Sequence, residues 1–213
     1  MPTSRRTLIA AATASAVASL ASVGRARADD TLDQQMAPRG LGKPDAPVKA
    51  SEWFSLTCPH CARFARDTLP QVEKQLVDPG KLYYVFKDFP LDQVALTAAM
   101  VARTLPASQY VPFCKTLLAT QDRWAFARDV NSTEELAKVA ALAGMSRATF
   151  NAAISDDALR QAILKEQDVG VKTYKVDSTP FFIFDGPGAK NRSTSGEISY
   201  DAFAKFVAGA AGA

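Results

Sequence analysis

Two cysteines and the only histidine of the chain lie within four consecutive residues, Cys58-Pro59-His60-Cys61. The apolar segment 48–56 precedes them and apolar residues at helical spacing follow, which indicates a strand that gives way to a helix. Closely spaced cysteines occur in zinc sites, haem attachment sites, structural disulfides and redox-active disulfides. The flanking residues distinguish among these four.

Zinc and haem fit this pattern poorly. A structural zinc site needs four ligands, usually in two separated pairs. This chain has one pair, a distant Cys114, and a histidine inside the loop of the pair itself. A c-type haem site has histidine directly after the second cysteine, where this chain has Ala62. We therefore expect no metal ion and no haem.

The position of the pair favours redox chemistry. Pro59 suits the first turn of a helix, which puts Cys58 at the N-cap. Backbone N–H groups at a helix start stabilise a thiolate, and His60 is expected to add a positive charge or a donor near the Cys58 sulfur. A purely structural disulfide across so short a loop would stabilise little. We predict that exposed Cys58 exchanges with a substrate disulfide or thiol and that Cys61 resolves the mixed disulfide.

Residues 1–28 resemble an export signal. They hold four arginines, two of them adjacent at positions 5 and 6, an Ala-rich apolar stretch and no acidic residue. The small-x-small sequence before Asp29 fits cleavage, and the route is Tat-like or Sec. Removing these four from the 25 basic residues leaves 21 against 22 acidic ones, so no charge pattern points to nucleic acid. We predict a periplasmic protein.

The remaining sequence predicts an α/β core with an inserted all-helical subdomain. An arm at 29–45 leads to a strand, helix and strand over 46–90. Residues 91–172 have the apolar spacing of several helices, and 173–213 return to two strands and a terminal helix. Cys114 lies in the insertion, where we expect a small buried apolar residue without a function.

The order of strand, C-P-H-C, helix, helical insertion and then Thr-Pro before a strand resembles the DsbA-like thiol:disulfide oxidoreductases. The resemblance spans residues 40–208 and includes "KDFPL" and "STPFFIFDG". It implies a thioredoxin-like core, a mixed sheet flanked by helices, with no cofactor beyond the cysteine pair. It also implies a monomeric oxidase that donates its disulfide to reduced exported proteins and is reoxidised by a DsbB-like, quinone-linked membrane protein.

The resemblance extends to three more residues. Thr179 and Pro180 match the family's cis-proline loop, which faces the cysteines and pairs with a substrate peptide. Glu52 matches a buried acid that relays protons to Cys61, whereas strand alternation alone leaves a solvent-facing side chain equally open. Thr179 departs from the best-known enterobacterial oxidases, which have valine, and is shared with isomerase and reductase branches.

An intracellular redox sensor is excluded only if residues 1–28 are cleaved, and two further alternatives remain open from the sequence. One is a disulfide isomerase or reductase of the same fold, although the short arm leaves little room for a dimerisation domain. The other is a non-catalytic periplasmic chaperone or metal-binding module, against which the few methionines and single histidine argue.

Overall fold

The computed structural model describes residues 31–212, in two units that divide between Ala37 and Pro38. The first unit contributes one described helix, at 31–36. The second unit holds the sheet, the cysteine pair and the helical insertion. The predicted export signal at 1–28 lies outside the described residues. Among the residues described, no helix combines the length and apolar character needed to cross a membrane.

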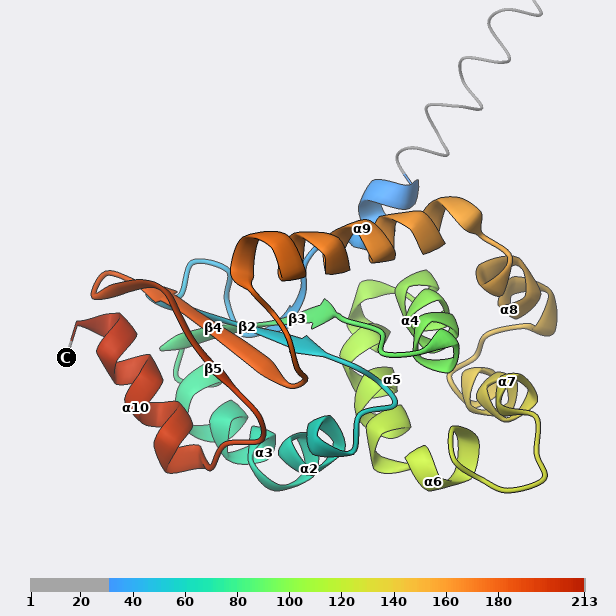
Figure 1. Ribbon diagram of the computed structural model, residues 1–213, viewed down its shortest axis with the longest axis horizontal. Helices are drawn as coiled ribbons and strands as arrows, with labels where there is room; N and C mark the ends of the chain where they lie inside the picture. The colour runs from blue at the N-terminus through green and yellow to red at the C-terminus, as the bar shows by residue number, and fades with distance from the viewer. Residues whose placement is uncertain (1–30, 213) are drawn as a thin grey trace, which may run out of the picture. The chain divides into compact units, whose positions relative to one another are not determined.

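A five-stranded mixed sheet forms the centre of the second unit (Figure 1). The strands run in the spatial order β1-β3-β2-β4-β5; β2 is parallel to β3, and the other neighbours are antiparallel. Their bounds are β1 Arg39–Leu41, β2 Val48–Phe54, β3 Leu82–Asp88, β4 Phe181–Gly186 and β5 Ala189–Ser195. The predicted thioredoxin-like mixed sheet is therefore confirmed.

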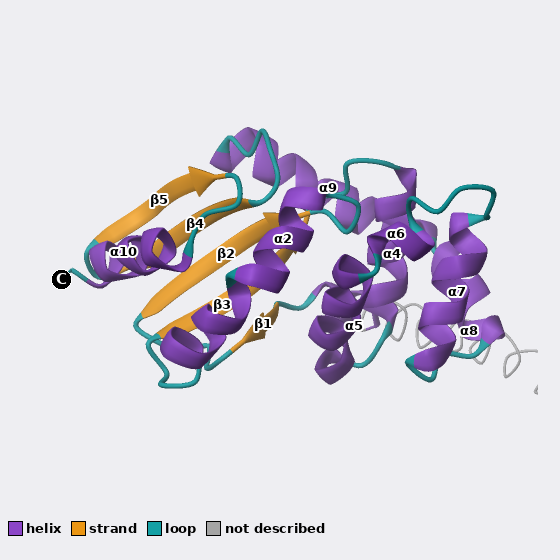
Figure 2. Cartoon of the chain, turned by 90° about the horizontal axis from the view of Figure 1, so that it is seen from below, coloured by secondary structure: helices purple, strands orange, loops and turns teal. Residues whose placement is uncertain are grey.

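Helices cover both faces of this sheet (Figures 1 and 2). One face carries α2 (Pro59–Asp67), α3 (Leu69–Val72), the π-helix η1 (Glu73–Val77) and α10 (Tyr200–Ala211), and the other carries α9 (Asp157–Tyr174). Beneath α2 and α10 lies an aromatic core that includes Phe64, Tyr84, Phe182 and Phe203. Each such side chain contributes about 1.5–3 kcal/mol by leaving water, so the core fixes the helix that begins at Cys58.

The chain between β3 and β4 is helical. It forms α4 (Gln93–Thr104), α5 (Ala107–Ala119), α6 (Gln121–Trp124), α7 (Ser132–Leu142) and α8 (Arg147–Ile154), and then α9. The last of these returns to the sheet, where Gly170 lies against Trp53. A Cβ at position 170 would come within 2.7 Å of the indole ring, so this approach needs glycine.

The structure corrects the predicted arm at 29–45. Residues 39–41 are not a lead-in; they form the edge strand β1, antiparallel to β3. The sequence Arg39-Gly40-Leu41 has no alternating apolar pattern, and so gave no strand signal. Gly40 is required there, because a Cβ would come within 2.4 Å of the Tyr84 carbonyl oxygen.

Candidate active site

Cys58 is the N-cap residue of α2, and Pro59 occupies the first turn. Its backbone is extended, with φ −80° and ψ 120°, as expected for a residue that ends a loop and begins a helix. Residues 55–58, here called the active-site loop, connect the end of β2 to this helix. The predicted N-cap position of Cys58 is confirmed, whereas its predicted exposure is wrong, because the packed loop leaves only 4% of its surface exposed.

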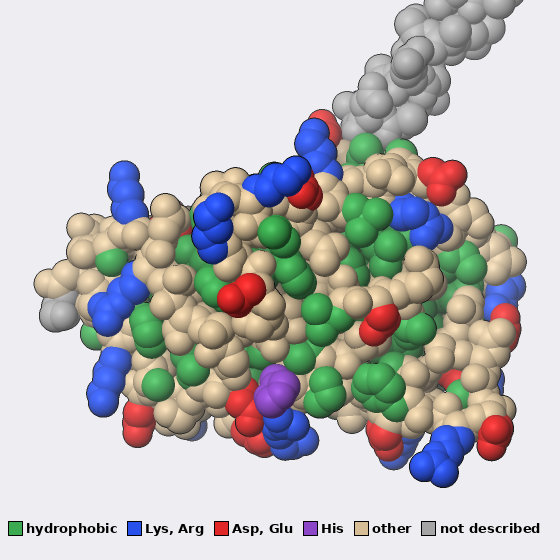
Figure 3. Space-filling view, viewed as in Figure 1, with side chains coloured by type: hydrophobic (Ala, Val, Ile, Leu, Met, Phe, Trp, Pro, Cys, Tyr) green, Lys and Arg blue, Asp and Glu red, His purple; other side chains and the backbone are tan. Residues whose placement is uncertain are grey.

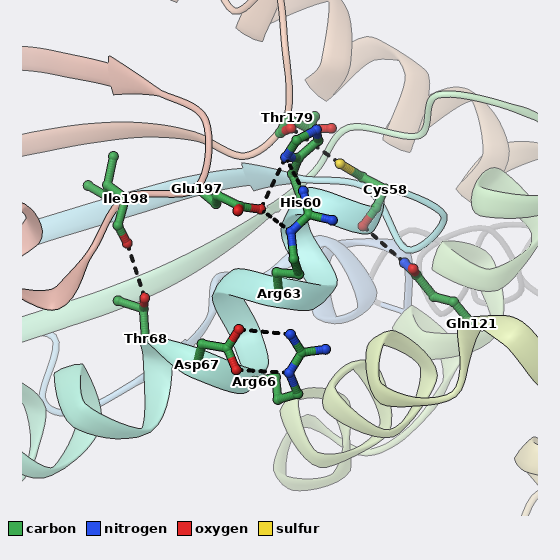
Figure 4. A network of polar contacts seen from close by, with 10 residues as sticks. All are labelled: Cys58, His60, Arg63, Arg66, Asp67, Thr68, Gln121, Thr179, Glu197 and Ile198. Carbon is green, nitrogen blue, oxygen red and sulfur yellow. Dashed lines mark hydrogen bonds and ion pairs between the residues drawn. The ribbon is translucent and has the colours of Figure 1, made fainter.

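The loop before β4 faces the cysteine pair from the other half of the core. The Thr179–Pro180 peptide bond is cis, as the family resemblance implies. In its protonated form the Cys58 thiol donates a hydrogen bond to the Thr179 carbonyl oxygen, with an Sγ–O distance of 3.2 Å (Figure 4). The Thr179 hydroxyl is buried and accepts or donates no hydrogen bond to any described atom. It is therefore available to a thiolate at Cys58.

The pKa of the Cys58 thiol is lowered to about 5. The largest cause is a hydrogen bond from the Cys61 thiol; burial acts in the opposite direction. The Thr179 side chain and the backbone N–H groups of Cys61 and His60 lower the pKa further. Hydrogen bonds that these groups donate to the sulfur are stronger when the sulfur is negatively charged, so they favour the thiolate. Cys58 is therefore a thiolate at neutral pH.

Cys61 has the opposite character. Its side chain is completely buried, and burial raises the pKa of its thiol well above the ordinary value. The thiol also donates to Cys58 and lies in the field of Glu52, and both effects raise the pKa further. One helical turn thus separates a sulfur that ionises readily from one that holds its proton.

Glu52 lies in the interior on β2, with 2% of its surface exposed. The Tyr84 hydroxyl donates to its Oε2 atom at 2.6 Å. Burial raises the pKa of this carboxyl to about 8, against the lowering effect of the Tyr84 hydrogen bond. The solvent-facing alternative is therefore wrong, and Glu52 carries a proton at neutral pH.

The hydrogen bonds described for the His60 imidazole go to Glu197 and Arg63. Its side chain is 59% exposed, and Nδ1 lies 3.1 Å from Glu197 Oε2 and 2.6 Å from an Arg63 guanidinium nitrogen (Figure 4). Arg63 Nε also donates to Glu197, at 2.6 Å. We predicted a contact between the imidazole and the Cys58 sulfur. In the structure the backbone N–H of His60, and not the imidazole, is the described donor to that sulfur.

The surface around His60 is partly apolar. In Figure 3 the purple side chain of the single histidine has green apolar side chains on one side and blue and red charged side chains directly below it. Leu91 and Phe126, which follow β3 and α6, are 53% and 54% exposed.

The third cysteine, Cys114, is fully buried in α5, and burial raises the pKa of its thiol.

Sequence reasoning missed several partners of the site. Gln121 on α6 donates to the active-site loop, and Thr57 in that loop donates to Asp92. Glu197 meets His60 from the segment before α10. These contacts join residues 35 to 137 positions apart, so no local motif signals them. Tyr84 had a weak signal, since it lies on a predicted strand beside that of Glu52.

Comparison with known proteins gives the family. The sequence pattern of the thioredoxin family matches residues 34–207. A curated protein of Rickettsia typhi, provisionally named protein-disulfide oxidoreductase, is 29% identical over 154 residues, which cover 72% of this chain and 56% of that protein. Disulfide bond formation protein D of Bacillus subtilis is 34% identical over 61 residues, 27% of this chain and 28% of that protein. The chain matches little more than half the length of the Rickettsia relative.

Solved structures agree. The crystal structure of alpha-DsbA1 from Wolbachia pipientis is 27% identical and has a TM-score of 0.73, covering 81% of this chain and 89% of that one. BdbD from Bacillus subtilis shares the fold, with a TM-score of 0.68 at 19% identity over 80% of this chain and 90% of that one. The chain belongs to the thioredoxin family, and its sequence and fold are similar to those of a DsbA protein.

Proposed function

We propose that this protein is a DsbA-like oxidase, an enzyme that donates its Cys58–Cys61 disulfide to reduced exported proteins. The observation that carries the proposal is the contrast between the two thiols. A thiol whose pKa is about 5 is a good leaving group, and its ionised form stabilises the reduced enzyme. A disulfide whose reduced form is stabilised in this way is a strong oxidant.

The first step is attack by a substrate thiolate on the Cys58 sulfur. The new bond joins the substrate sulfur to Cys58, and the Cys58–Cys61 bond breaks with its electron pair on Cys61. Because burial raises the pKa of Cys61, that sulfur takes up a proton. Glu52 carries a proton at neutral pH and is the proposed source, directly or through water.

The second step releases the product. Another thiolate of the substrate attacks the substrate sulfur of the mixed disulfide, and Cys58 leaves as a thiolate. The substrate has lost two electrons and two protons. The enzyme has gained two electrons and, on Cys61, one proton from Glu52; one of the two protons that the substrate released restores the proton of Glu52, and the other goes to solvent. In this proposal the Thr179 carbonyl and the cis-Pro180 loop align the substrate backbone beside Cys58.

Location and partners belong to the same proposal. The pattern in residues 1–28 supports export to the periplasm by a Tat-like or Sec signal. The family resemblance supports reduced exported proteins as substrates, a monomeric enzyme and reoxidation by a DsbB-like, quinone-linked membrane protein. Reduced protein added to membranes with and without such an oxidase would test the last point through oxygen or quinone consumption.

The decisive experiment is the redox equilibrium of the cysteine pair with glutathione, followed by tryptophan fluorescence. Trp53 and Trp124 are both buried and serve as reporters, with a Cys58→Ser variant as the unresponsive control. We expect a reduction potential near about −120 mV, the value of a strong DsbA oxidant. A potential near about −270 mV, the value of thioredoxin, would contradict the proposal and favour a reductase.

A further inference from the structure

Gln121 reaches the active-site loop from the helical insertion. It is the first residue of α6, is 7% exposed, and its side-chain Nε2 donates to two backbone oxygens. The distances are 2.8 Å to the carbonyl oxygen of Leu56 and 3.1 Å to that of Cys58. Figure 4 shows the amide directed at Cys58 from the insertion side. One buried amide thus binds the loop on both sides of Thr57.

The two carbonyls differ in how they are otherwise bound. The amide of Gln121 supplies the hydrogen bond described for the Leu56 carbonyl. The Cys58 carbonyl also accepts from the Ala62 N–H at 3.1 Å, the first hydrogen bond of α2. Two donors therefore fix the orientation of the Cys58 carbonyl, and with it the ψ angle of the N-cap residue. That angle decides whether the N–H groups of His60 and Cys61 point at the Cys58 sulfur.

We propose that Gln121 is a positioning residue for Cys58, through which the helical insertion holds the N-cap carbonyl and keeps the Cys58 sulfur over the backbone donors of α2. The inference rests on the proposed function and deepens it, because it gives the insertion a part in the oxidising chemistry. Gln121 does not touch the sulfur or a substrate in this arrangement. Its action passes through the backbone of Cys58.

A second hydrogen bond between the insertion and the active-site loop does not involve Cys58. The Thr57 hydroxyl donates to Asp92 Oδ2 at 2.7 Å, and Asp92 is the N-cap residue of α4. This bond holds the side chain of Thr57 and leaves the Cys58 carbonyl untouched. Among the hydrogen bonds described from the insertion to the active-site loop, those of Gln121 alone include Cys58.

The test removes the amide and measures the Cys58 thiol. Gln121→Met keeps the length of the side chain and removes both donors, whereas Gln121→His keeps one N–H. Tyr110→Phe is the matched control, because it also removes one buried hydrogen bond from the insertion to the core, to Asp88 of β3, and leaves the bonds of Gln121 to the Leu56 and Cys58 carbonyls in place. The ionisable neighbours Glu52 and Cys61 are unchanged in all three variants.

The readouts are the pH titration of the thiolate by ultraviolet absorbance in the reduced full chain and the equilibrium with glutathione. We expect Gln121→Met to raise the pKa of Cys58 by about one unit, which makes the pair about tenfold less oxidising at pH 7. Gln121→His should shift the pKa by less, and Tyr110→Phe should leave it unchanged even if its unfolding temperature falls.

The outcomes separate the two proposals. A wild-type Cys58 that titrates like an ordinary thiol would overturn the proposed function itself. A low pKa in the wild type that persists in a folded Gln121→Met variant would overturn only the role of Gln121. If Gln121→Met does not fold, Gln121→His decides: a raised pKa supports the role and an unchanged one rejects it. A shift of equal size in Tyr110→Phe would also reject it, since the effect would then follow stability alone.

Discussion

Glu52 and Asp88 are acidic residues on neighbouring strands, each 2% exposed, and their side chains have opposite surroundings. Asp88, at the end of β3, accepts from Arg103 Nε at 2.6 Å and from the Tyr110 hydroxyl at 2.9 Å. Glu52, on β2, has the Tyr84 hydroxyl as its described donor and no described cation. One acid is neutralised by a buried partner, and the other avoids its charge by keeping a proton.

The difference teaches how the molecule separates structure from chemistry. The Asp88–Arg103 pair joins β3 to α4, and burial lowers the pKa of Arg103 while Asp88, Tyr110 and Glu166 raise it above its ordinary value. Such a group never changes charge near neutral pH. Glu52 has a pKa of about 8, so it can exchange a proton in the working range. The ion pair of Asp88 with Arg103 is a permanent link between β3 and α4, whereas Glu52, which has no described cation beside it, can titrate.

Breaking the paired region should have the largest effect. Arg103→Met leaves Asp88 buried without its cation, so we expect a loss of about 3–5 kcal/mol in the free energy of unfolding. Urea unfolding at pH 7 measures it. The control is Arg147→Met, which breaks an ion pair with Glu134 whose partners are both about half exposed and should cost no more than about 1 kcal/mol. Equal losses in the two variants would remove the distinction between paired burial and surface pairing.

Changing the unpaired acid should have the opposite sign. A carboxyl whose folded pKa is raised stabilises fully below the unfolded pKa of 4.5, and that contribution is lost as pH rises toward about 8. Glu52→Gln avoids the loss, so we expect a gain of about 2–3 kcal/mol in the unfolding free energy at pH 8 and none below pH 4.5. Urea unfolding of the oxidised protein across this range gives the profile. The variant should also resolve mixed disulfides more slowly, and a flat pH profile would rule out the raised pKa.

Cys58 sharpens the comparison, because its pKa is shifted downward. Its contribution to the reduced protein is fully present above the unfolded pKa of 9 and is lost as pH falls through about 5. After allowance for solvent screening we expect it to supply about 2 kcal/mol at pH 7. The measurement is the difference in unfolding free energy between reduced wild type and Cys58→Ser from pH 5 to about pH 9. Parallel profiles would show that Cys58 is an ordinary thiol.

The smallest effect is expected at Cys114. This thiol is buried in α5, and burial and the charge of Asp88 raise its pKa well above the ordinary value, against smaller lowering effects of Tyr110 and Arg103. Cys114→Ala should cost about 1 kcal/mol through the small cavity it leaves and should not move the reduction potential of the Cys58–Cys61 pair. Urea unfolding tests the expected loss of stability, and equilibration with glutathione tests the unchanged reduction potential. A changed potential would give Cys114 a part in the redox chemistry.

The sequence predicted those parts of the fold and site that local patterns encode. The N-cap of Cys58 and the strands around it follow from local patterns, whereas the cis bond before Pro180 was implied only by the family resemblance. Edge strand β1 was missed because its three residues have no alternation and are held by β3. The partner of His60 was missed because Glu197 is 137 residues away, and only the packed structure brings the two together.

The strand order of the sheet also determines when, during synthesis and folding, Thr179 can reach Cys58. Trp53 on β2 pairs with Phe181 on β4, so two neighbouring central strands are separated in sequence by the whole helical insertion. Cys58 and Thr179, which form a hydrogen bond, are likewise 121 residues apart. Closing so long a loop costs chain entropy and is slow compared with local helix formation. A nascent chain that ends before β4 has both cysteines and no Thr179 beside them. The contribution of Thr179 to the low pKa of Cys58 therefore arises only after the chain through β4 has been made and folded.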